Sequence, residues 1–502
     1  MATSTIISHE GNNLPRQRLV LRVADPDFGI LKGIVLRRYP DYEWATFARF
    51  GWRDTPDTLV VTLACIDAPI SGDLDEQVGH VAIDEQYTLR IALSAEKHRL
   101  AVGVIHSHPE NGVPFPSRID DDMDSYYAGY FSDFVPDRPY ISLILSVVDG
   151  KLVISGRAFW RGQWLVLERT AAERLTIETW PGGHTPIRKN FERDRVARFA
   201  SAFGEESLQR LRGSTAAVIG AGGTGSAAIE VLARAGVGRL IIADPDYTDR
   251  SNLERNHGSY PEDAAANTPK VLVAANHVRA IDPSIMVTAF LGRLPQKEIV
   301  DEVVTADVVL GCTDQQHSRL ALSDLAFRYL LPSIDCGVVL EGKDGNITGQ
   351  VAQFARFLSA DPCALCREMI TPERISQELM SDEEKTQRQR AAAEARERGE
   401  DPNPYWHNQA QINTVGYLTT AVGAMIAGYA IGWLTKRFDT PFERLQMNFV
   451  AKYLDVTDLA QKQRSACACA RFRGWADQAN ADSLISAPVH WPKVQRLWVG
   501  NG

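Results

Sequence analysis

TAAVIGAGGTGS, residues 215–226, decides the fold of the larger part of this chain. A short apolar run typical of a buried strand ends in closely spaced glycines, and an apolar helix-like segment follows over residues 226–236. Such glycines let the backbone approach a phosphate at the start of the helix, where amide groups and the helix dipole favour anions. The pattern predicts a nucleotide-binding turn at Gly220, Gly222, Gly223 and Gly225.

The alternation of strand and helix continues beyond this turn. Residues 239–244 and 307–314 read as further strands, which is typical of a parallel, doubly wound α/β sheet. Asp244 and Asp246 stand at the end of the first of them, where a carboxylate is expected on the ribose hydroxyls. By these features alone the ligand would be a dinucleotide such as NAD.

The residues that follow depart from a dehydrogenase. They are SNLERN at residues 251–256, Lys270, and GCTDQQHSR with Asp314 and Arg319. Cations and a carboxylate suit a triphosphate and its Mg²⁺ ion better than a hydride donor. We therefore expect ATP in this site. The alternative is a Rossmann-like domain whose site residues have lost their function.

From about Arg195 to Cys469 the chain resembles the ThiF/MoeB superfamily of ubiquitin-activating-type enzymes. The resemblance implies that the carboxylate of a carrier's C-terminal glycine attacks ATP to form an acyl-adenylate. It also implies ribose binding by Asp244, magnesium binding by Asp314, and phosphate contacts from Asn252, Arg255 and Lys270. RVARFASAFG resembles the family's RYxRQ segment, so Arg198, with Arg195, is a candidate phosphate contact donated across a homodimer interface.

The cysteines bear on both metal and mechanism. Cys363, Cys366, Cys467 and Cys469 supply four thiolates, which predict a structural zinc site, with free buried cysteines as the alternative. Family members often carry paired cysteines at these places.

No cysteine lies between residues 367 and 413, where activating enzymes often carry a thioester nucleophile, and Cys312 and Cys336 read as buried strand residues. We expect the adenylate to pass to a thiol on a conjugating-type partner.

A second motif stands in HSHPENGVPFPSRIDDD, residues 106–122. Alternate residues of a strand point the same way, so His106 and His108 present two imidazoles together. Asp120, at the start of a helix, could return a carboxylate to the same ion. Two His and one Asp with a fourth position left for water is the open coordination of a catalytic zinc, whereas the alternative is two surface histidines beside a helix cap.

This motif resembles the JAB/MPN (JAMM) family, whose members cleave isopeptide or peptide bonds at the C-terminus of ubiquitin-like proteins. The resemblance implies that Ser117 helps to stabilise the oxyanion and that an upstream Glu accepts the proton of the zinc-bound water. Among Glu43, Glu76, Glu85 and Glu96 we choose Glu43, because it lies just before the first long strand, where the family's Glu stands.

The length of 502 residues predicts more than one core. We expect an α/β protein with a mixed α/β JAB/MPN domain over residues 1–175, a linker over 176–190, and a Rossmann-like ThiF/MoeB domain over 191–475 followed by a tail over 476–502. A crossing loop should span about 367–413. Its charged part, residues 375–404, reads as a mobile loop or an exposed helix.

Composition limits the partners. A net charge of −9 without clustered Lys and Arg argues against nucleic acid. Residues 415–434 carry no charge, but their Gly, Ala and Thr favour a buried helix over a membrane span. The first residues lack the apolar core of a signal peptide, so we expect a cytoplasmic protein.

Together these features predict a bacterial fusion enzyme that processes or deconjugates a ubiquitin-like or sulfur-carrier protein with zinc, and adenylates its C-terminal glycine with ATP and Mg²⁺. Two alternatives stay open. One is ATP-dependent modification of a small peptide's C-terminus, which the missing cysteine permits. The other is a scaffold that binds carriers through two inactive sites.

Overall fold

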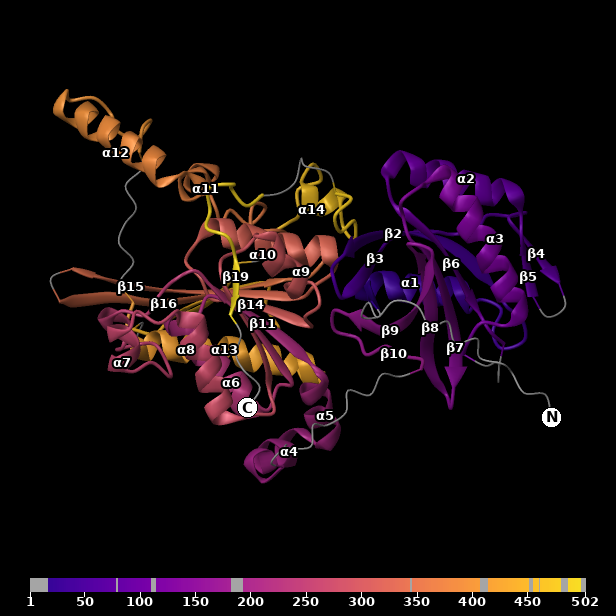
Figure 1. The fold of residues 1–502 in the computed structure, drawn as a ribbon, viewed down its shortest axis with the longest axis horizontal. Coiled ribbons are helices and arrows are strands. Elements are labelled where there is room, and N and C mark those ends of the chain that lie inside the picture. Colours follow the sequence, from indigo (N-terminus) through magenta and orange to yellow (C-terminus); the bar gives the residue numbers. More distant parts are fainter. Residues whose placement is uncertain are drawn as a thin grey trace.

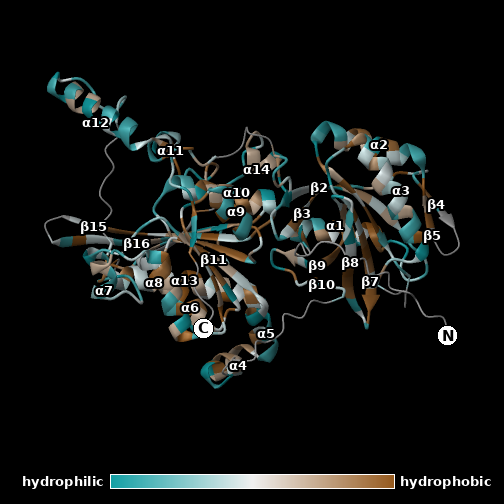
Figure 2. Cartoon of the chain, viewed as in Figure 1, coloured by the Kyte–Doolittle hydropathy of each residue, from teal (hydrophilic) through white to brown (hydrophobic). Residues whose placement is uncertain are grey.

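The computed structural model describes residues 17–77, 80–109, 114–181, 193–343, 345–406, 414–450, 455–459, 461–479 and 486–497. Figure 1 shows two units side by side, each built on a sheet with helices packed against it. In Figure 2 the strands inside both units are largely brown, so apolar side chains lie between sheet and helices. The chain is therefore a mixed α/β protein, as predicted, and it has two large sheets and a separate two-stranded one.

The first unit is an eight-stranded sheet in the order β10-β8-β7-β6-β2-β3-β1-β9. β9 pairs with β1 on one side and with β8 on the other, so the sheet closes on itself. A separate hairpin joins β4 (Leu74–Gln77) and β5 (His80–Ile83). The sheet strands are β1 Arg18–Val23, β2 Ala45–Asp54, β3 Thr58–Asp67, β6 Ala101–Ser107, β7 Tyr140–Val148, β8 Lys151–Trp160, β9 Gln163–Ala172 and β10 Glu178–Thr179.

Helices cover both faces of this sheet. Phe47 and Ala48 are neighbours on β2 and point to opposite faces, because successive side chains of a strand alternate. Ala48 lies in the apolar cluster that includes α1 (Asp25–Val35). Phe47 lies under α2 (Glu85–His98) and α3 (Arg118–Phe134), with the rings of aromatic residues from both helices edge-on to it at centroid distances of 5.0 to 5.7 Å.

The second unit is a nine-stranded sheet in the order β18-β17-β16-β15-β14-β11-β12-β13-β19. The five strands from β15 to β13 run parallel, and antiparallel strands extend the sheet at both ends. The strands are β11 Thr215–Ile219, β12 Arg239–Asp244, β13 Met286–Leu291, β14 Val308–Gly311, β15 Ser333–Lys343, β16 Asn346–Phe357, β17 Arg444–Asn448, β18 Asp455–Asp458 and β19 Gln495–Leu497.

Helices cover both faces of the parallel strands, as expected for a doubly wound sheet. α6 (Gly223–Ala235), α8 (Lys270–Ile281) and α13 (Gly416–Thr435) bury apolar side chains on one face. α9 (Lys297–Val303) and α10 (Gln316–Tyr329) do so on the other. The remaining helical segments are η1 Arg193–Val196, α4 Ala197–Phe203, α5 Glu205–Gly213, η2 Arg250–Asn252, α7 Pro261–Ala265, α11 Pro372–Leu379, α12 Asp382–Glu397 and α14 Ala468–Arg471.

α13 is long and apolar enough to cross a membrane by length and composition alone. In this fold it packs against α6 at very short range. A side chain at Gly423 would place its Cβ 2.4 Å from the carbonyl oxygen of Thr224. The most apolar window of α13 is 67% buried, which agrees with the predicted buried helix.

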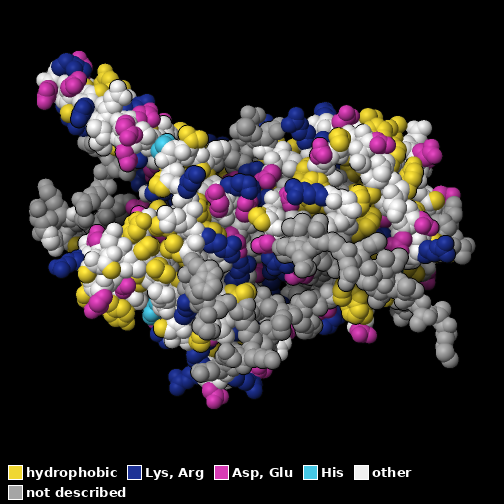
Figure 3. All heavy atoms as spheres, viewed as in Figure 1, with side chains coloured by type: hydrophobic (Ala, Val, Ile, Leu, Met, Phe, Trp, Pro, Cys, Tyr) yellow, Lys and Arg dark blue, Asp and Glu magenta, His cyan; other side chains and the backbone are white. Residues whose placement is uncertain are grey.

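The charged segment of residues 375–404 contributes to two helices that follow β16, α11 and α12. α12 extends away from the body of the molecule, and in Figure 2 it is mostly teal. Figure 3 shows acidic and basic side chains intermixed on it. Of the two alternatives that the sequence left open, the exposed helix is therefore the one that the structure contains.

The structure also differs from the predicted boundaries. Inside the expected linker, Glu178 and Thr179 pair with β8, whereas residues 182–190 lie outside the described residues. Inside the expected tail, Ala476 bridges to Trp52 of the first unit and β19 pairs with β13. Both segments are held by strand pairing with distant partners, which the local sequence does not specify.

A shared core and buried polar contacts join the two units. Val60 of β3 lies in the same apolar cluster as Ile219 and Leu325 of the second unit. Arg22 of β1 is fully buried and donates hydrogen bonds to the carbonyl oxygens of Val304 and Ala306, just after α9. These carbonyls would otherwise lack partners at a helix end. Burial, and then repulsion from a neighbouring arginine, lowers the pKa of Arg22 to about 9.

We predict that Arg22→Met lowers the free energy of unfolding by about 3 kcal/mol, because it leaves two buried carbonyl oxygens without donors. Urea unfolding followed by circular dichroism measures the change. Arg37→Ala is the control, since the Arg37 side chain is exposed and its loss should cost less than about 0.5 kcal/mol. Equal effects of the two substitutions would contradict the role of Arg22.

Candidate active sites

The glycine-rich turn joins β11 to α6. Gly220 has φ +96°, a left-handed conformation that favours glycine. A Cβ at Gly225 would lie 1.9 Å from the carbonyl oxygen of Gly220, so the first turn of α6 packs directly on the loop. A Cβ at Gly222 would meet nothing within 4 Å. Gly225 is thus required by packing, whereas Gly222 leaves room beside the backbone for a ligand.

A cavity of about 450 Å³ opens at the carboxyl ends of the parallel strands. That volume lies within the range of small-molecule sites, and the strand ends are where open α/β sheets bind ligands. Most of the residues predicted for the nucleotide line it: Gly220, Gly222, Gly223, Asp244, Asp246, Arg255, Lys270 and Asp314. The fold therefore brings glycines, carboxylates and cations from well-separated parts of the chain to one cavity.

Asp244 is the best anchored of these carboxylates. It is buried, and its two oxygens accept hydrogen bonds from the backbone N–H groups of Ala221, at 2.6 Å, and Asp246, at 2.8 Å. Burial, and then the charge of Asp246, raises the pKa of Asp244 to about 6. The Lys270 ammonium lies 2.9 Å from an oxygen of Asp246, so a cation stands beside both carboxylates.

Other predicted residues lie elsewhere. Gly225 supports the loop without lining the cavity. Asn252 is buried in a hydrogen-bonded cap at Asp249. Arg198 is exposed on α4 and does not line the cavity of its own chain. Arg195 forms an ion pair with Asp282, so its charge is used within the fold.

The structure adds residues that the motifs did not identify. Arg293, just after β13, and Arg374, on α11, both line the cavity. Arg293 follows a strand end, which is a usable signal, whereas nothing local marks Arg374. Cys312 was expected to be a buried strand residue, but it lies just after β14, is half-buried and lines the cavity with its Sγ 4.0 Å from that of Cys336.

The histidine pair of the first unit lies at the end of β6. Pairing of β2 with β6 places Ala45 opposite His106, and the backbone N–H of Ser107 donates to the carbonyl oxygen of Trp44. Glu43 lies two residues before β2 begins and is half-buried. Nε2 of His106 lies 3.2 Å from Nε2 of His108, so the two imidazoles face the same side.

Asp120 completes this cluster from the first turn of α3. Its two oxygens lie 3.1 Å from Nε2 of His106 and 3.5 Å from Nε2 of His108, and one ligand atom from each of the three residues lies within 4.8 Å of the others. Burial alone would raise the pKa of Asp120, but hydrogen bonds from the two histidines hold it well below its usual range. Two nitrogens and one carboxylate around one point fit a zinc ion with an open position.

Ser117 positions Asp120. Its Oγ accepts from the Asp120 backbone N–H at 3.2 Å, and its own N–H donates to the Asp120 carboxylate at 2.6 Å. This capping box starts α3, so the helix cap and the metal cluster use the same residues. Among the other glutamates considered for the base, Glu85 and Glu96 are exposed on α2 and Glu76 lies in β4.

The four paired cysteines also meet. The Sγ atoms of Cys363 and Cys467 are 3.5 Å apart, and those of Cys366 and Cys469 are 3.8 Å apart. Tetrahedral Zn–S bonds of about 2.3 Å require sulfur atoms roughly 3.8 Å apart. The CxxC and CxC pairs therefore fit a closed structural zinc site in spite of their unequal spacing.

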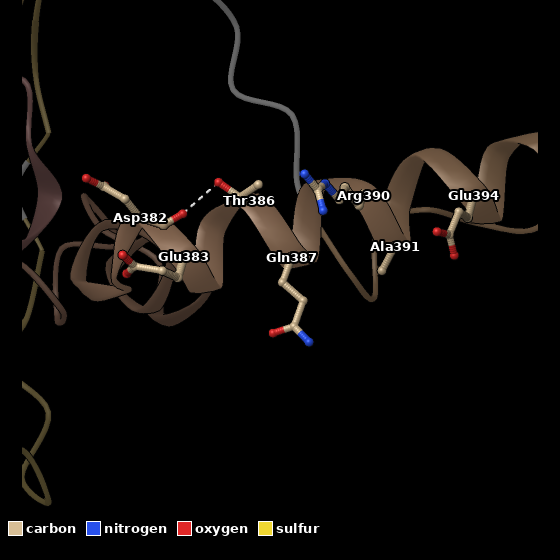
Figure 4. Close-up of a pocket in the computed structure, with 7 residues that line it drawn as sticks. All are labelled: Asp382, Glu383, Thr386, Gln387, Arg390, Ala391 and Glu394. Carbon is tan, nitrogen blue, oxygen red and sulfur yellow. Dashed lines mark hydrogen bonds between the residues drawn. The ribbon is translucent and has the colours of Figure 1, made fainter.

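A further hollow lies along α12, and Figure 4 shows the side chains that line it. They are Asp382, Glu383, Thr386, Gln387, Arg390, Ala391 and Glu394, all from this one helix. The Thr386 hydroxyl donates to the carbonyl oxygen of Asp382, as in an ordinary helix turn. The described residues bring no group from another element to this hollow, so it is not a candidate active site.

Comparison with known proteins gives the following matches. Residues 194–470 match the ThiF family. The chain is 37% identical over 122 residues to a SAMP-activating enzyme E1 of Haloferax volcanii, covering 24% of this chain and 44% of that protein. It is 37% identical over 134 residues to the sulfur carrier protein ThiS adenylyltransferase of Escherichia coli, covering 27% and 53%. These matches span about half the length of the relatives.

Molybdopterin-synthase adenylyltransferase of Escherichia coli is 30% identical over 164 residues, which cover 33% of this chain and 62% of that protein. Among solved structures, the crystal structure of E. coli MccB with ATP aligns with a TM-score of 0.41 at 16% identity. The alignment covers 56% of this chain and 76% of MccB.

We predict that Gly225→Ala lowers the free energy of unfolding by about 3 kcal/mol, because its Cβ would collide with the Gly220 carbonyl oxygen. Gly222→Ala is the matched control, with open space at its Cβ and an expected change below about 0.5 kcal/mol. Thermal unfolding of the two variants measures the difference. Similar losses in both would contradict the packing argument.

We also predict that the purified chain holds two zinc ions, measured by elemental analysis. His106→Ala should lose one ion with little change in thermal stability, because the open cluster lies at a strand end. Cys469→Ala should lose the other ion and lower the melting temperature, since a closed four-thiolate site contributes folding energy. Two ions retained in either variant would contradict the assignment of that site.

Proposed function

The chain belongs to the ThiF family, and we propose that it uses ATP to adenylate the C-terminal carboxylate of a ubiquitin-like or sulfur-carrier protein. One observation carries the proposal. The glycine-rich loop, the buried carboxylate of Asp244, five lysine and arginine side chains, and the exposed carboxylates of Asp246 and Asp314 line a single cavity. The identities of two relatives, a SAMP-activating enzyme and a sulfur carrier protein adenylyltransferase, support the substrate class.

Each group has a role in the proposed adenylation. A carboxylate oxygen of the carrier attacks the α-phosphorus of ATP, a new O–P bond forms, and the bond to the bridging oxygen breaks to release pyrophosphate. Amide groups of the loop at Gly222 and Gly223 and the start of α6 bind the phosphates. Lys270 and Arg255 neutralise the charge on the leaving pyrophosphate, Asp244 holds the ribose, and Asp314 would hold Mg²⁺.

We propose that the first unit is a JAMM-type zinc peptidase. The cluster of His106, His108 and Asp120 supports it, since these residues fit an open zinc site. Zinc bound there would lower the pKa of its water to about 7 and polarise the scissile carbonyl. Glu43, two residues before Ala45, the pairing partner of His106, would accept the proton of the attacking water. The Ser117 Oγ accepts a hydrogen bond from the Asp120 N–H, so its hydroxyl hydrogen can be donated to the oxyanion.

The two activities would act on one end of the same carrier. A peptidase that removes residues beyond a terminal glycine exposes the carboxylate that the adenylating cavity requires. We propose this order, maturation followed by activation, with the adenylate passed to a thiol on a partner protein. We also propose a homodimer in which the exposed Arg198 of one protomer reaches the cavity of the other.

The adenylation half is tested by ATP–pyrophosphate exchange with glycine-ended carriers. We predict that Lys270→Ala and Asp314→Ala each lower kcat by about 10²- to 10³-fold, because each removes charge compensation at the reacting phosphates. His106→Ala should leave the exchange rate unchanged, since it alters only the other site. Exchange at the wild-type rate in both cavity variants would contradict the proposed adenylation. The absence of exchange with every glycine-ended carrier would contradict it as well.

The peptidase half is tested with a carrier that ends several residues beyond its glycine. We predict that Glu43→Gln lowers the cleavage rate by about 10²- to 10⁴-fold while zinc stays bound, because it removes the general base and no ligand. Glu96→Gln is the matched control, as Glu96 is exposed on α2. Cleavage at the wild-type rate in Glu43→Gln would exclude Glu43 as the base.

A further inference from the structure

Arg293 differs from the other cations of the nucleotide cavity. Of the described residues, none accepts a hydrogen bond or forms an ion pair with its guanidinium, although Arg293 is half-buried and lines the cavity. The other lysine and arginine side chains that line the cavity each donate to a protein oxygen: Arg255 to the Ser251 carbonyl, Lys270 to Asp246, Arg319 to Asp335 and Arg374 to Glu378.

The C-terminal segment of residues 486–497 holds Arg293 in place. The guanidinium carbon lies 5.2 Å from the ring centre of Trp491, which is 9% exposed. The Arg293 backbone N–H donates to Gln296 Oε1 at 2.9 Å, and Gln296 Nε2 donates to the carbonyl oxygen of Pro492 at 2.7 Å. Both the backbone and the side chain of Arg293 are thus fixed by contacts that involve this segment.

The same segment packs against elements that border the cavity. β19 pairs with β13 immediately before Arg293, and the Trp491 ring lies 5.1 Å from the ring of His317 at the start of α10. Residues 486–497 follow the region that matches the ThiF family, which ends at residue 470. Trp491 of this segment contacts two side chains that line the cavity, Arg293 and His317.

The position of Arg293 along the sheet indicates which part of the nucleotide it meets. The strand order is β14-β11-β12-β13. The phosphate loop follows β11, and Asp244, at the end of β12, is the proposed ribose ligand. Arg293 follows β13, one strand further from the loop. The ribose joins the phosphates to the base, so a base attached to a ribose at Asp244 extends to the side away from the loop, which is the side of Arg293.

We propose that Arg293 binds the purine base of the nucleotide and that Trp491 is its positioning residue. The inference rests on the proposed ATP-dependent function and adds a base-recognition element to it. Trp491 covers one side of the planar guanidinium, whose other side and N–H donors can stack on a purine and bond to its ring nitrogens. The larger ring of a purine offers more stacking area than a pyrimidine, so this contact favours ATP over CTP.

Calorimetric titration of the full chain with ATP and with CTP, in the presence of Mg²⁺ and without a carrier, tests the inference. We predict that Arg293→Ala weakens ATP binding about tenfold and CTP binding by about threefold or less, so that the preference for ATP shrinks. Trp491→Leu should also reduce the preference for ATP over CTP. Trp491→Phe, which keeps an aromatic face, should retain most of that preference. A merely structural role of Trp491 would alter stability without changing the ratio of the two affinities.

Arg496→Ala is the control, because Arg496 is 60% exposed on the same segment, lies over Phe290 and does not line the cavity. Equal weakening of ATP and CTP in Arg293→Ala would assign Arg293 to the phosphates and overturn the inference. So would unchanged binding of both nucleotides, while the proposed function would stand. A wild-type chain that binds no ATP would overturn the proposed function itself.

Discussion

The buried contact between Arg22 and the carbonyl oxygens after α9 is the constraint that joins the two units. Burying an arginine costs free energy unless acceptors satisfy its N–H donors. The contact therefore forms only when β1 and α9 are both folded and correctly placed against each other. The apolar cluster around Val60 crosses the same boundary. The cluster of His106, His108 and Asp120 and the cavity of the second unit are therefore held on a common framework.

Both candidate sites use the same structural device, which is the collection of polar side chains at the ends of buried strands. In the first unit the register of β2 with β6 sets Ala45 against His106, two residues after Glu43, and a capping box delivers Asp120. In the second, parallel strands deliver the glycine loop, Asp244 and Asp314 to one edge. Strand interiors supply apolar burial and the ends supply chemistry, so one sheet serves both purposes.

Much of this arrangement could be predicted from local sequence. Glycine spacing after an apolar run identified the loop, and HxHP with SxxD identified a metal cluster whose atoms do converge. What local sequence could not supply depends on long-range pairing. Trp491 reaches Arg293 only because β19 pairs with β13, and Cys312 lines the cavity because β14 ends one residue earlier. Asn252 shows the converse, since the side chain of this motif residue forms a hydrogen-bonded cap with Asp249.

The most direct test of two linked activities is a single reaction. A carrier with residues beyond its terminal glycine is incubated with the chain, zinc, ATP and Mg²⁺, and its mass is followed by mass spectrometry. We predict that a shortened carrier appears first and its adenylate second, and that His106→Ala abolishes both products from the extended carrier while still adenylating a carrier that already ends in glycine. Adenylation of the extended carrier without shortening would contradict the link between the two sites.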